Sequence, residues 1–258
     1  MQLLGRNLGL GGMKSNPKPM RMHLFLFMLL FGLFPTACQD ETDPAPEDDT
    51  LSYDFETSTE GWLSGFADLP LSGRDIFELE AGHATLPEPL DTQEGALRIS
   101  GHNRSDDLFM FWKRPITGLQ PETTYEITFS VAMASQYPQS SAGIGGSPGG
   151  AVHFKVGAVT GEPMLVEETV GSRDYHRLDI DKGNQSQSGE DMRVLGTVGI
   201  PGEEFTYQLI TFSNKAQPTT VRTDTEGTCW VIIGTDSGFE GKTTLYYDRI
   251  ELQLEAVE

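Results

Sequence analysis

Residues 108–134 read LFMFWKRPITGLQPETTYEITFSVAMA, and this stretch decides the fold that we expect. Its second half alternates between apolar and polar side chains, which is typical of a β-strand with one buried and one solvated face. The link at 115–121 contains Gly118 and two prolines, so it cannot continue a strand on either side. The stretch therefore predicts a strand, a turn and a second strand. The buried face of the second strand is expected to hold Tyr125, Ile127, Phe129, Val131 and Met133.

The chain from Leu51 onward continues in the same manner, with short strand-like segments separated by turn residues such as Pro201-Gly202. No segment keeps an apolar stripe with a 3.6-residue period over three turns, so little helix is expected. Many short strands at regular spacing predict an all-β fold, a jelly-roll-like β-sandwich of antiparallel strands. The expected strands are 51–56, 96–101, 108–114, 123–134, 151–160, 192–200, 205–213, 219–224, 229–236 and 243–254.

Two polar segments between these strands are predicted to be long loops. Residues 135–150 are rich in Gly and Ser, and residues 181–191 are polar with two glycines. Long loops inside compact domains are either functional or mobile, and the composition leaves both readings open.

The charge of the chain is strongly acidic. Its 258 residues include 18 Lys and Arg against 38 Asp and Glu. Four of these bases and none of the acids precede Cys38, so 14 bases stand against 38 acids in the remainder, a formal charge of −24. Such a surface repels phosphate backbones and argues against nucleic acid as a partner. It is compatible with neutral glycans, cations or basic protein surfaces.

The N-terminal residues are predicted to be an export signal. Basic residues up to Arg21 precede an apolar run from Leu24 to Phe34, which is shorter than the roughly 20 residues that a membrane span needs and fits a signal peptide. The run ends at Pro-Thr-Ala-Cys38, which resembles the bacterial lipobox. That resemblance implies cleavage before Cys38 and lipid attachment to its thiol. The alternative is an ordinary secretory signal with an unrelated cysteine.

Residues 38–50 are acidic, contain two prolines and lack large apolar side chains, so they are predicted to form a disordered tether. Acids directly after the lipobox cysteine also resemble the surface-export signal of Bacteroidetes-type lipoproteins. The predicted organisation is a signal peptide at 1–37, the tether at 38–50 and a single β-sandwich domain at 51–258. The protein is expected at the bacterial membrane, on the outer membrane or the cell surface.

Three parts of the domain resemble the carbohydrate-binding-module-like jelly rolls. They are the run GLQPETTYEITF at 118–129, the opening pair Phe55-Glu56 with Gly61-Trp62, and the closing strand YYDRIEL at 246–252. The resemblance implies a jelly roll that binds a glycan. It also implies a structural calcium ion near the first strand, held in part by the Asp of the closing strand.

In this sequence that Asp is Asp248. Counting by twos places it on one face with Tyr246, Ile250 and Leu252, where an unpaired carboxylate is costly. Following the resemblance, Asp248 together with Asp54 or Glu56 is predicted to bind calcium, an ion that prefers oxygen ligands. The alternative is that Asp248 accepts hydrogen bonds from a Tyr, a Thr or a backbone N–H group.

The aromatic residues suggest where a sugar could bind, because an exposed ring can cover the apolar C–H face of a sugar. Trp112, Tyr137 and Tyr175 are the candidate ligand-binding residues, with a core position as the alternative for Trp112. Trp62 and Trp230 are predicted to lie in the core.

The sequence gives little indication of a catalytic site. Residues 145–149 match the G-x-S-x-G pattern by letter but lack the strand before and the helix after that the motif requires. The histidines outside the leader are not paired at metal-binding spacing, so zinc is not indicated. Cys229 lies in an apolar run and is predicted to be a buried structural thiol. The favoured function is a non-catalytic envelope lipoprotein that is glycan-binding or carbohydrate-associated. The alternative is a structural or protein-interaction lipoprotein, and a hydrolase is the least favoured.

Overall fold

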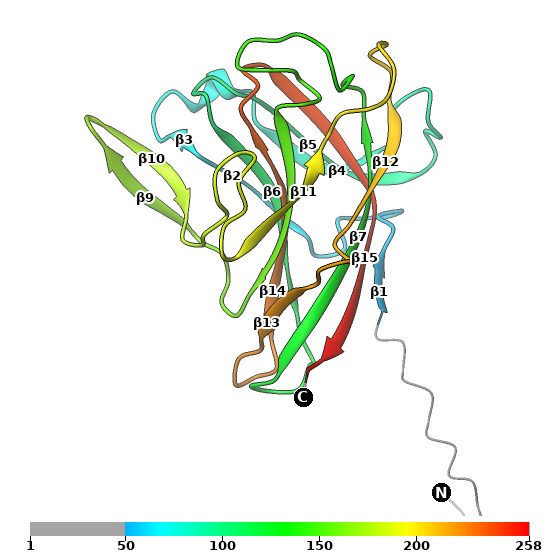
Figure 1. Cartoon of the computed structure of the whole chain (residues 1–258), viewed down its shortest axis with the longest axis vertical. Coiled ribbons are helices and arrows are strands. Elements are labelled where there is room, and N and C mark those ends of the chain that lie inside the picture. Colours follow the sequence, from blue (N-terminus) through cyan, green and yellow to red (C-terminus); the bar gives the residue numbers. More distant parts are fainter. Residues whose placement is uncertain (1–49, 258) are drawn as a thin grey trace, which may run out of the picture. The chain divides into compact units, whose positions relative to one another are not determined.

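The computed structural model describes residues 50–257, which form a β-sandwich (Figure 1). Its elements are β1 (Thr50–Tyr53), β2 (Leu63–Ala67), β3 (Leu69–Pro70), a short 3-10 turn η1 (Arg74–Phe77), β4 (Glu80–Thr85), β5 (Gly95–His102), β6 (Leu108–Ile116), β7 (Thr124–Ser135), β8 (Val152–Val159), β9 (Leu165–Val170), β10 (Arg173–Leu178), β11 (Met192–Thr197), β12 (Gln208–Ser213), β13 (Thr219–Arg222), β14 (Cys229–Ser237) and β15 (Lys242–Ala256). Within these residues no helix is long and apolar enough to span a membrane.

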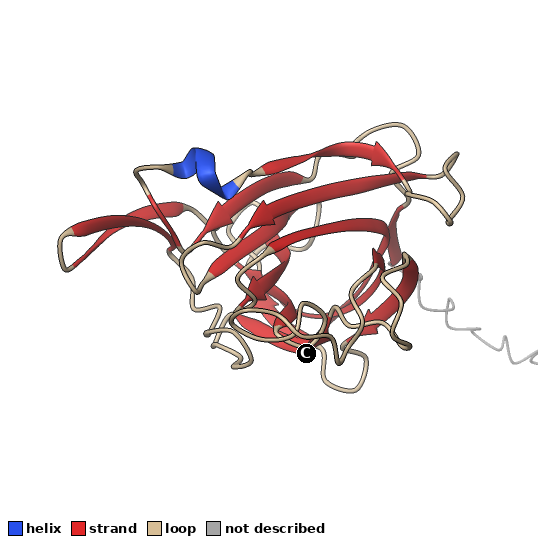
Figure 2. Ribbon diagram, turned by 90° about the horizontal axis from the view of Figure 1, so that it is seen from above, coloured by secondary structure: helices blue, strands red, loops and turns tan. Residues whose placement is uncertain are grey.

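Two large antiparallel sheets face each other. The seven-stranded sheet has the order β12-β7-β15-β5-β4, with β1 beside β15 and β13 beside β7. The five-stranded sheet has the order β11-β8-β14-β6-β2. A small third sheet, β3-β10-β9, carries the β9–β10 hairpin, which extends away from the sandwich (Figure 2). The predicted all-β sandwich of antiparallel strands is therefore confirmed.

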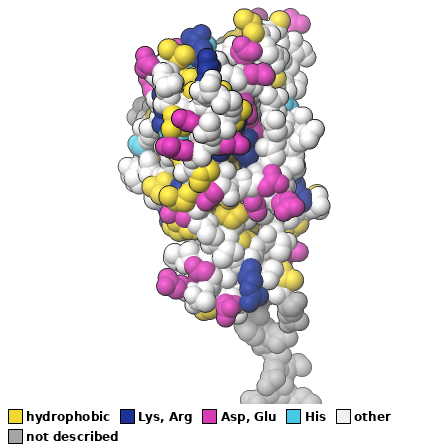
Figure 3. Space-filling model, turned by 90° about the vertical axis from the view of Figure 1, so that its left-hand side faces the viewer, with side chains coloured by type: hydrophobic (Ala, Val, Ile, Leu, Met, Phe, Trp, Pro, Cys, Tyr) yellow, Lys and Arg dark blue, Asp and Glu magenta, His cyan; other side chains and the backbone are white. Residues whose placement is uncertain are grey.

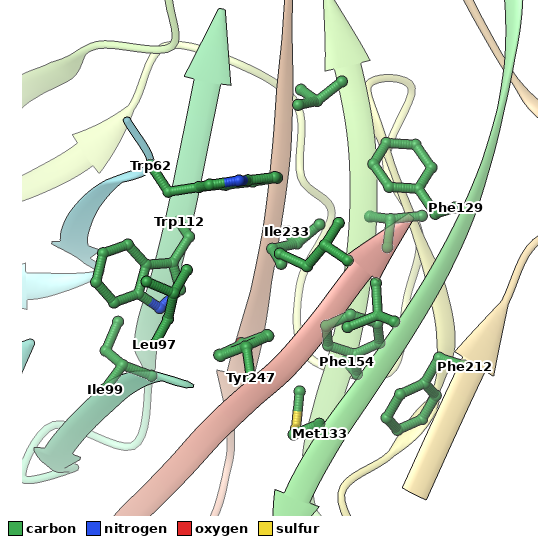
Figure 4. Close-up of a cluster of buried hydrophobic side chains, with 14 of the residues drawn as sticks. Trp62, Leu97, Ile99, Trp112, Phe129, Met133, Phe154, Phe212, Ile233 and Tyr247 are labelled. Carbon is green, nitrogen blue, oxygen red and sulfur yellow. The ribbon is translucent and has the colours of Figure 1, made fainter. Parts of the chain in front are cut away.

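The core lies between the two large sheets and is built by the predicted alternation of β7. All five side chains of its predicted buried face are at most 5% exposed. They share one cluster with Trp112 of β6, Phe154 of β8 and Ile233 of β14 (Figure 4). Burial of each large apolar side chain contributes about 1.5–3 kcal/mol, so this layer supplies much of the stability of the sandwich.

The closing strand β15 departs from simple alternation. Its register against β7 shifts between Tyr247 and Arg249, which is a β-bulge at Asp248. As a result Tyr247, Ile250 and Leu252 face the core, whereas Tyr246 and Asp248 are half-buried. The prediction that Tyr246 and Asp248 share a face with Ile250 is wrong, because the extra residue of the bulge inverts the alternation before it.

The first strand pairs with the last one. Strand β1 lies antiparallel to β15, with Tyr53 opposite Ile250. This pairing confirms that the two ends of the domain lie together, as the resemblance to jelly rolls implied.

A second apolar layer covers the outer face of the five-stranded sheet. Phe109, Phe111 and Ile232 point outward from β6 and β14 and pack against Leu178 at the end of β10 and Met192 of β11. Strands β6 and β14 are therefore buried on both faces, which explains their nearly continuous apolar sequences. The base of the β9–β10 hairpin and the 179–191 segment complete this layer, and they also position the clefts described next.

Candidate binding clefts beside the β9–β10 hairpin

A cleft of about 620 Å³ lies between the β9–β10 hairpin, the 180–184 segment and the residues that follow β2 and precede β6. We call it the charged cleft. Its apolar lining comes from Val166, Leu178 and Ile180, and its polar lining is dominated by Asp, Glu, Arg and Lys. The volume falls within the roughly 300–1,000 Å³ that is usual for ligand sites. Acidic side chains are spread over this side of the molecule, and basic ones gather in a few places (Figure 3).

Asp236 is the centre of an ion-pair network behind this cleft. Alternation along β14 turns Thr235 and Ser237 inward and Asp236 outward, where its side chain is fully buried under the 182–187 segment. One carboxylate oxygen, Oδ2, accepts hydrogen bonds from Lys155 Nζ at 2.8 Å, Lys182 Nζ at 2.8 Å and the Gln185 N–H group at 2.9 Å. The contacts from Lys182 and Gln185 attach the 182–187 segment to β14 of the five-stranded sheet.

Asp68 extends the network to the hairpin. Its Oδ1 lies 2.6 Å from Arg177 Nη1, and its Oδ2 lies 2.8 Å from Lys182 Nζ. Arg177 also donates from Nε to Glu168 of β9 at 3.0 Å. Arg177 and Lys182 are thus both engaged by carboxylates. Asp68, which follows β2, therefore joins the β9–β10 hairpin to the 182–187 segment.

The carboxyl groups of Asp236 and Asp107 have opposite pKa shifts. Burial opposes ionisation of Asp236, but the charges of Lys182 and Lys155 outweigh it and hold its pKa below the usual value. Burial, together with the negative charges of Asp68 and Asp236, raises the pKa of Asp107 to about 8, and the charge of Lys182 opposes this shift. Asp107 is therefore a neutral carboxylic acid near pH 7.

The three aspartates could also hold a metal ion. Asp68, Asp107 and Asp236 each place one carboxylate oxygen within 4.8 Å of the others. Oδ1 of Asp107 and Oδ1 of Asp236 are buried without a hydrogen-bond partner from the described residues. However, Lys182 already contacts two of these carboxylates, so a divalent ion would lie beside its ammonium group. A proton on Asp107 satisfies the two free oxygens without this repulsion and suits the donor set better than a metal.

A second cleft, of about 380 Å³, adjoins the first. We call it the arginine cleft, because Arg104 and Arg173 line it together with Tyr175. The guanidinium of Arg177 lies over the Tyr175 ring, 5.2 Å from its centroid, and the Ser105 hydroxyl donates to the Asp107 carbonyl at 2.8 Å. The two clefts therefore meet along β10 and the 104–107 segment. Tyr175 is half-buried, so part of its ring is accessible.

The predicted ligand contact is wrong for Trp112 and Tyr137, and the alternative core position of Trp112 is confirmed. Trp112 is only 1% exposed, because it points from β6 into the core. Tyr137 is 6% exposed, and its hydroxyl accepts a hydrogen bond from the Thr244 N–H group at 2.7 Å. Neither ring can present a face to a ligand. Tyr175 is the candidate that remains at the surface, and its role stays a prediction.

The other two tryptophans, Trp62 and Trp230, differ in their burial. Trp62 is 2% exposed, which confirms its predicted core position. Trp230 is half-buried and is not part of the core, so the prediction of a core position is wrong for it. It points outward from β14, and the Lys113 ammonium lies 5.4 Å from the centre of its ring.

The predicted calcium ligands are only partly brought together. Burial raises the pKa of Asp248, and the nearby charges of Glu94 and Glu56 add to this effect against Arg249. Glu56 and Asp248 are thus within electrostatic range of each other. The carboxylate of Asp54 instead accepts the Glu56 N–H group at 3.3 Å and caps a turn. Calcium at this place stays a prediction.

The residues of the charged cleft were not found from the sequence. A signal was present, because Lys155 interrupts the apolar strand VHFKVGAV and Asp236 lies one residue before the end of the apolar strand CWVIIGTDS. A charge inside such a strand needs a partner. Pairing the two strands antiparallel would have suggested that these charges compensate each other.

Comparison with known proteins gives a likeness in fold only. No protein-family model and no curated protein matches the chain. Among solved structures, a carbohydrate-binding module of the β-sandwich superfamily is 12% identical over 82% of this chain and 62% of its own, with a TM-score of 0.37. The mannan-recognising module TmCBM27 is 13% identical over 80% of this chain and 96% of its own, with a TM-score of 0.36. The tailspike protein 4 domain of bacteriophage CBA120 is 7% identical over 79% of this chain, with a TM-score of 0.33, and this chain spans 20% of its length. At these values, nothing about a ligand of the present protein follows from them.

Proposed function

We propose that this protein is a non-catalytic, lipid-anchored protein of the bacterial cell envelope, and that it binds a glycan at the two clefts beside β10. The observation that carries the proposal is the position of Tyr175, whose ring lines the arginine cleft and contacts Arg177, a residue that lines the charged cleft. A sugar presents an apolar C–H face to such a ring and hydroxyl groups to polar side chains around it. The arginine cleft offers both kinds of contact, because its lining includes the Tyr175 ring and the polar side chains of Arg104 and Arg173.

The shape of the site favours a chain-like ligand over a compact one. Two adjoining clefts of about 620 and 380 Å³ can hold successive units of an oligosaccharide. The charged groups of the larger cleft are mostly paired with each other, so a neutral, hydroxyl-rich unit can approach without displacing an ion pair. Nucleic acid is a poor candidate, because the surface is strongly acidic.

The same pairing supports a binding function rather than hydrolysis. Glycosidases require two carboxyl groups that both reach the scissile bond. Of the carboxylates at and behind the charged cleft, Asp236 is fully buried and Asp68 is 4% exposed, and both are engaged by lysine or arginine side chains, so neither of these two is placed to reach a scissile bond. These carboxylates fasten the loop and the hairpin to the sheet.

Replacing Tyr175 by alanine is expected to weaken glycan binding at least tenfold, which corresponds to about 1.4 kcal/mol. The unfolding free energy should change by less than about 1 kcal/mol, because only the partly exposed ring and its contact with Arg177 are lost. Binding is measured on a glycan array and then by calorimetry with the best glycan. Stability is measured by urea unfolding.

Trp112→Ala is the matched control, since it removes a ring from the core instead of the cleft. It should cost about 3–5 kcal/mol of stability. If Tyr175→Ala binds the selected glycan as tightly as the unmodified protein, the ring is not part of the site and the proposal loses its main support.

Anchoring is proposed at Cys38, which lies outside the described residues. Several acyl chains, each contributing about 0.8 kcal/mol per buried CH₂, would make attachment effectively permanent. Cys38→Ser should move the protein from the membrane fraction to the soluble fraction. Cys229→Ala is the control, because Cys229 is buried in the core and its loss should leave the fractionation unchanged. Membrane association of Cys38→Ser with the leader removed would contradict lipid anchoring.

A further inference from the structure

We infer that the arginine cleft binds the acidic group, a carboxylate or a sulfate, of one unit of a saccharide chain. This inference rests on the proposed glycan-binding function and names the class of glycan. Its starting point is a local reversal of charge. The chain from Cys38 onward has a formal charge of −24, yet this cleft is lined by Arg104 and Arg173 and by no Asp or Glu.

The two arginines keep their hydrogen-bonding capacity for a ligand. Arg173 is exposed at the start of β10 and has no carboxylate partner among the described residues. Arg104 has one carboxylate neighbour, Glu78, at 3.8 Å, and both side chains are 44% exposed. Glu78 is bound more closely by Lys242, at 2.9 Å. This contrasts with Arg177, which is engaged by Asp68 and Glu168.

The chemistry of the lining suits an acidic sugar in particular. A guanidinium is planar and can donate two parallel hydrogen bonds to a carboxylate or a sulfate. The Tyr175 ring and the exposed side chain of Ile76 offer apolar surface beside the arginines. The sugar ring can therefore rest on Tyr175 while its acidic group meets the arginines. The hydroxyl of Ser72 adds a further polar contact at the edge of the cleft.

The neighbouring charged cleft restricts the charge of the next sugar unit in the saccharide chain. Glu167, Glu168 and Asp181 line it, and backbone N–H groups of Glu190 and Gly183 hold the pKa of Asp181 below its usual value. A second anionic unit would meet these carboxylates without a free cation to receive it. The expected ligand thus has isolated acidic units flanked by neutral ones. Repulsion from the rest of the surface is screened beyond about 8 Å at physiological salt, so it does not prevent a single contact ion pair.

The test measures binding of the full-length mature protein to four oligosaccharides of matched length by calorimetry. They are an alternating uronate–hexose chain, its sulfated counterpart, the neutral hexose chain and a polyuronate. The alternating uronate or the alternating sulfated chain should bind at least tenfold more tightly than the neutral chain and the polyuronate. Whichever of the two binds identifies the anion.

Arg173→Gln should reduce the affinity for the acidic chain at least tenfold, and it should reduce the affinity for the neutral chain by a smaller factor, because the neutral chain has no acidic group to lose its partner. Arg222→Gln is the matched control, because Arg222 is also exposed on an outer strand and has only a 3.8 Å contact with Glu122. Unchanged melting temperatures would show that both variants fold. Arg104→Gln provides a second variant at the cleft with the same expected loss.

The outcomes separate this inference from the function on which it rests. If the neutral chain binds as tightly as the acidic ones and Arg173→Gln has no effect, glycan binding stands and the acidic specificity is wrong. If the polyuronate binds most tightly, the restriction by the charged cleft is wrong. If none of the four chains binds and the glycan array is also blank, both the inference and the proposed function fail.

Discussion

Asp236→Ala is expected to lower the unfolding free energy by about 3–5 kcal/mol, the usual cost of removing one partner of a buried ion pair. The variant leaves the ammonium group of Lys155, which is fully buried, without its counter-ion. Lys182 keeps Asp68 but loses its second carboxylate. The 182–187 segment also loses the acceptor for the Gln185 N–H group. Urea unfolding of the variant and of the unmodified protein measures the difference.

Two further variants make this result specific. Glu162→Ala removes the partner of Lys113 at a contact of the same length, 2.8 Å, but Glu162 is 41% exposed. Such a surface pair contributes about 0–1 kcal/mol, so its loss should be small. The double variant Asp236→Leu with Lys155→Met should be more stable than Asp236→Ala, because it leaves no lone charge at Lys155. Equal effects of Asp236→Ala and Glu162→Ala would contradict a structural function for the network.

The sequence predicted the strands that alternate or are buried on both faces. Strand β7 is the clearest case, because its alternation directly gave the residues that face the core. Strand β9 could not be found in this way. All six of its residues are exposed, so its sequence LVEETV has no buried face to create a period. Strand β4 could not be predicted from alternation either, since none of its residues is fully buried.

The errors in side-chain placement have a tertiary cause. Trp230 points away from the core in a strand that is apolar on both faces, and local pattern does not distinguish the two faces. Tyr137 lies in a Gly- and Ser-rich segment that suggested exposure. Its buried hydroxyl accepts a hydrogen bond from the Thr244 N–H group, which is 107 residues away in the chain. Asp248 was assigned to the wrong face because a β-bulge has no reliable signature in a single sequence.

The candidate site was the least predictable part. Of its rings, Tyr175 was identified from the sequence, but its environment was not. The clefts depend on how the β9–β10 hairpin and the 180–184 segment lie against the ends of β2 and β6. These segments are far apart in the chain, and the ion pairs that join them, such as Asp68 with Arg177, span 109 residues. The only sequence signal for this network was the presence of Lys155 and Asp236 within otherwise apolar strands.

The unfolding free energy is expected to fall as the pH rises from about 4 to about 8, because of Asp107. In the unfolded chain its carboxyl group should ionise near pH 3.9, whereas burial and the charges of Asp68 and Asp236 raise its pKa to about 8 in the folded protein. Between these values the folded state holds a proton that the unfolded state has released. Rising pH then favours unfolding, by up to about 1.4 kcal/mol per pH unit. The stabilisation that comes from the proton on Asp107 is complete below about pH 4 and lost above about pH 8.

Asp107→Asn is expected to remove this dependence, because an amide stays neutral throughout. Asp181→Asn serves as the control. Asp181 is exposed, and its lowered pKa places its titration below pH 4, so this variant should keep the slope of the unmodified protein between pH 5 and pH 8. Urea unfolding at intervals of one pH unit measures the slopes. If Asp107→Asn and the unmodified protein lose stability equally over this range, Asp107 does not carry the proton, and the buried carboxyl groups must be neutralised in another way.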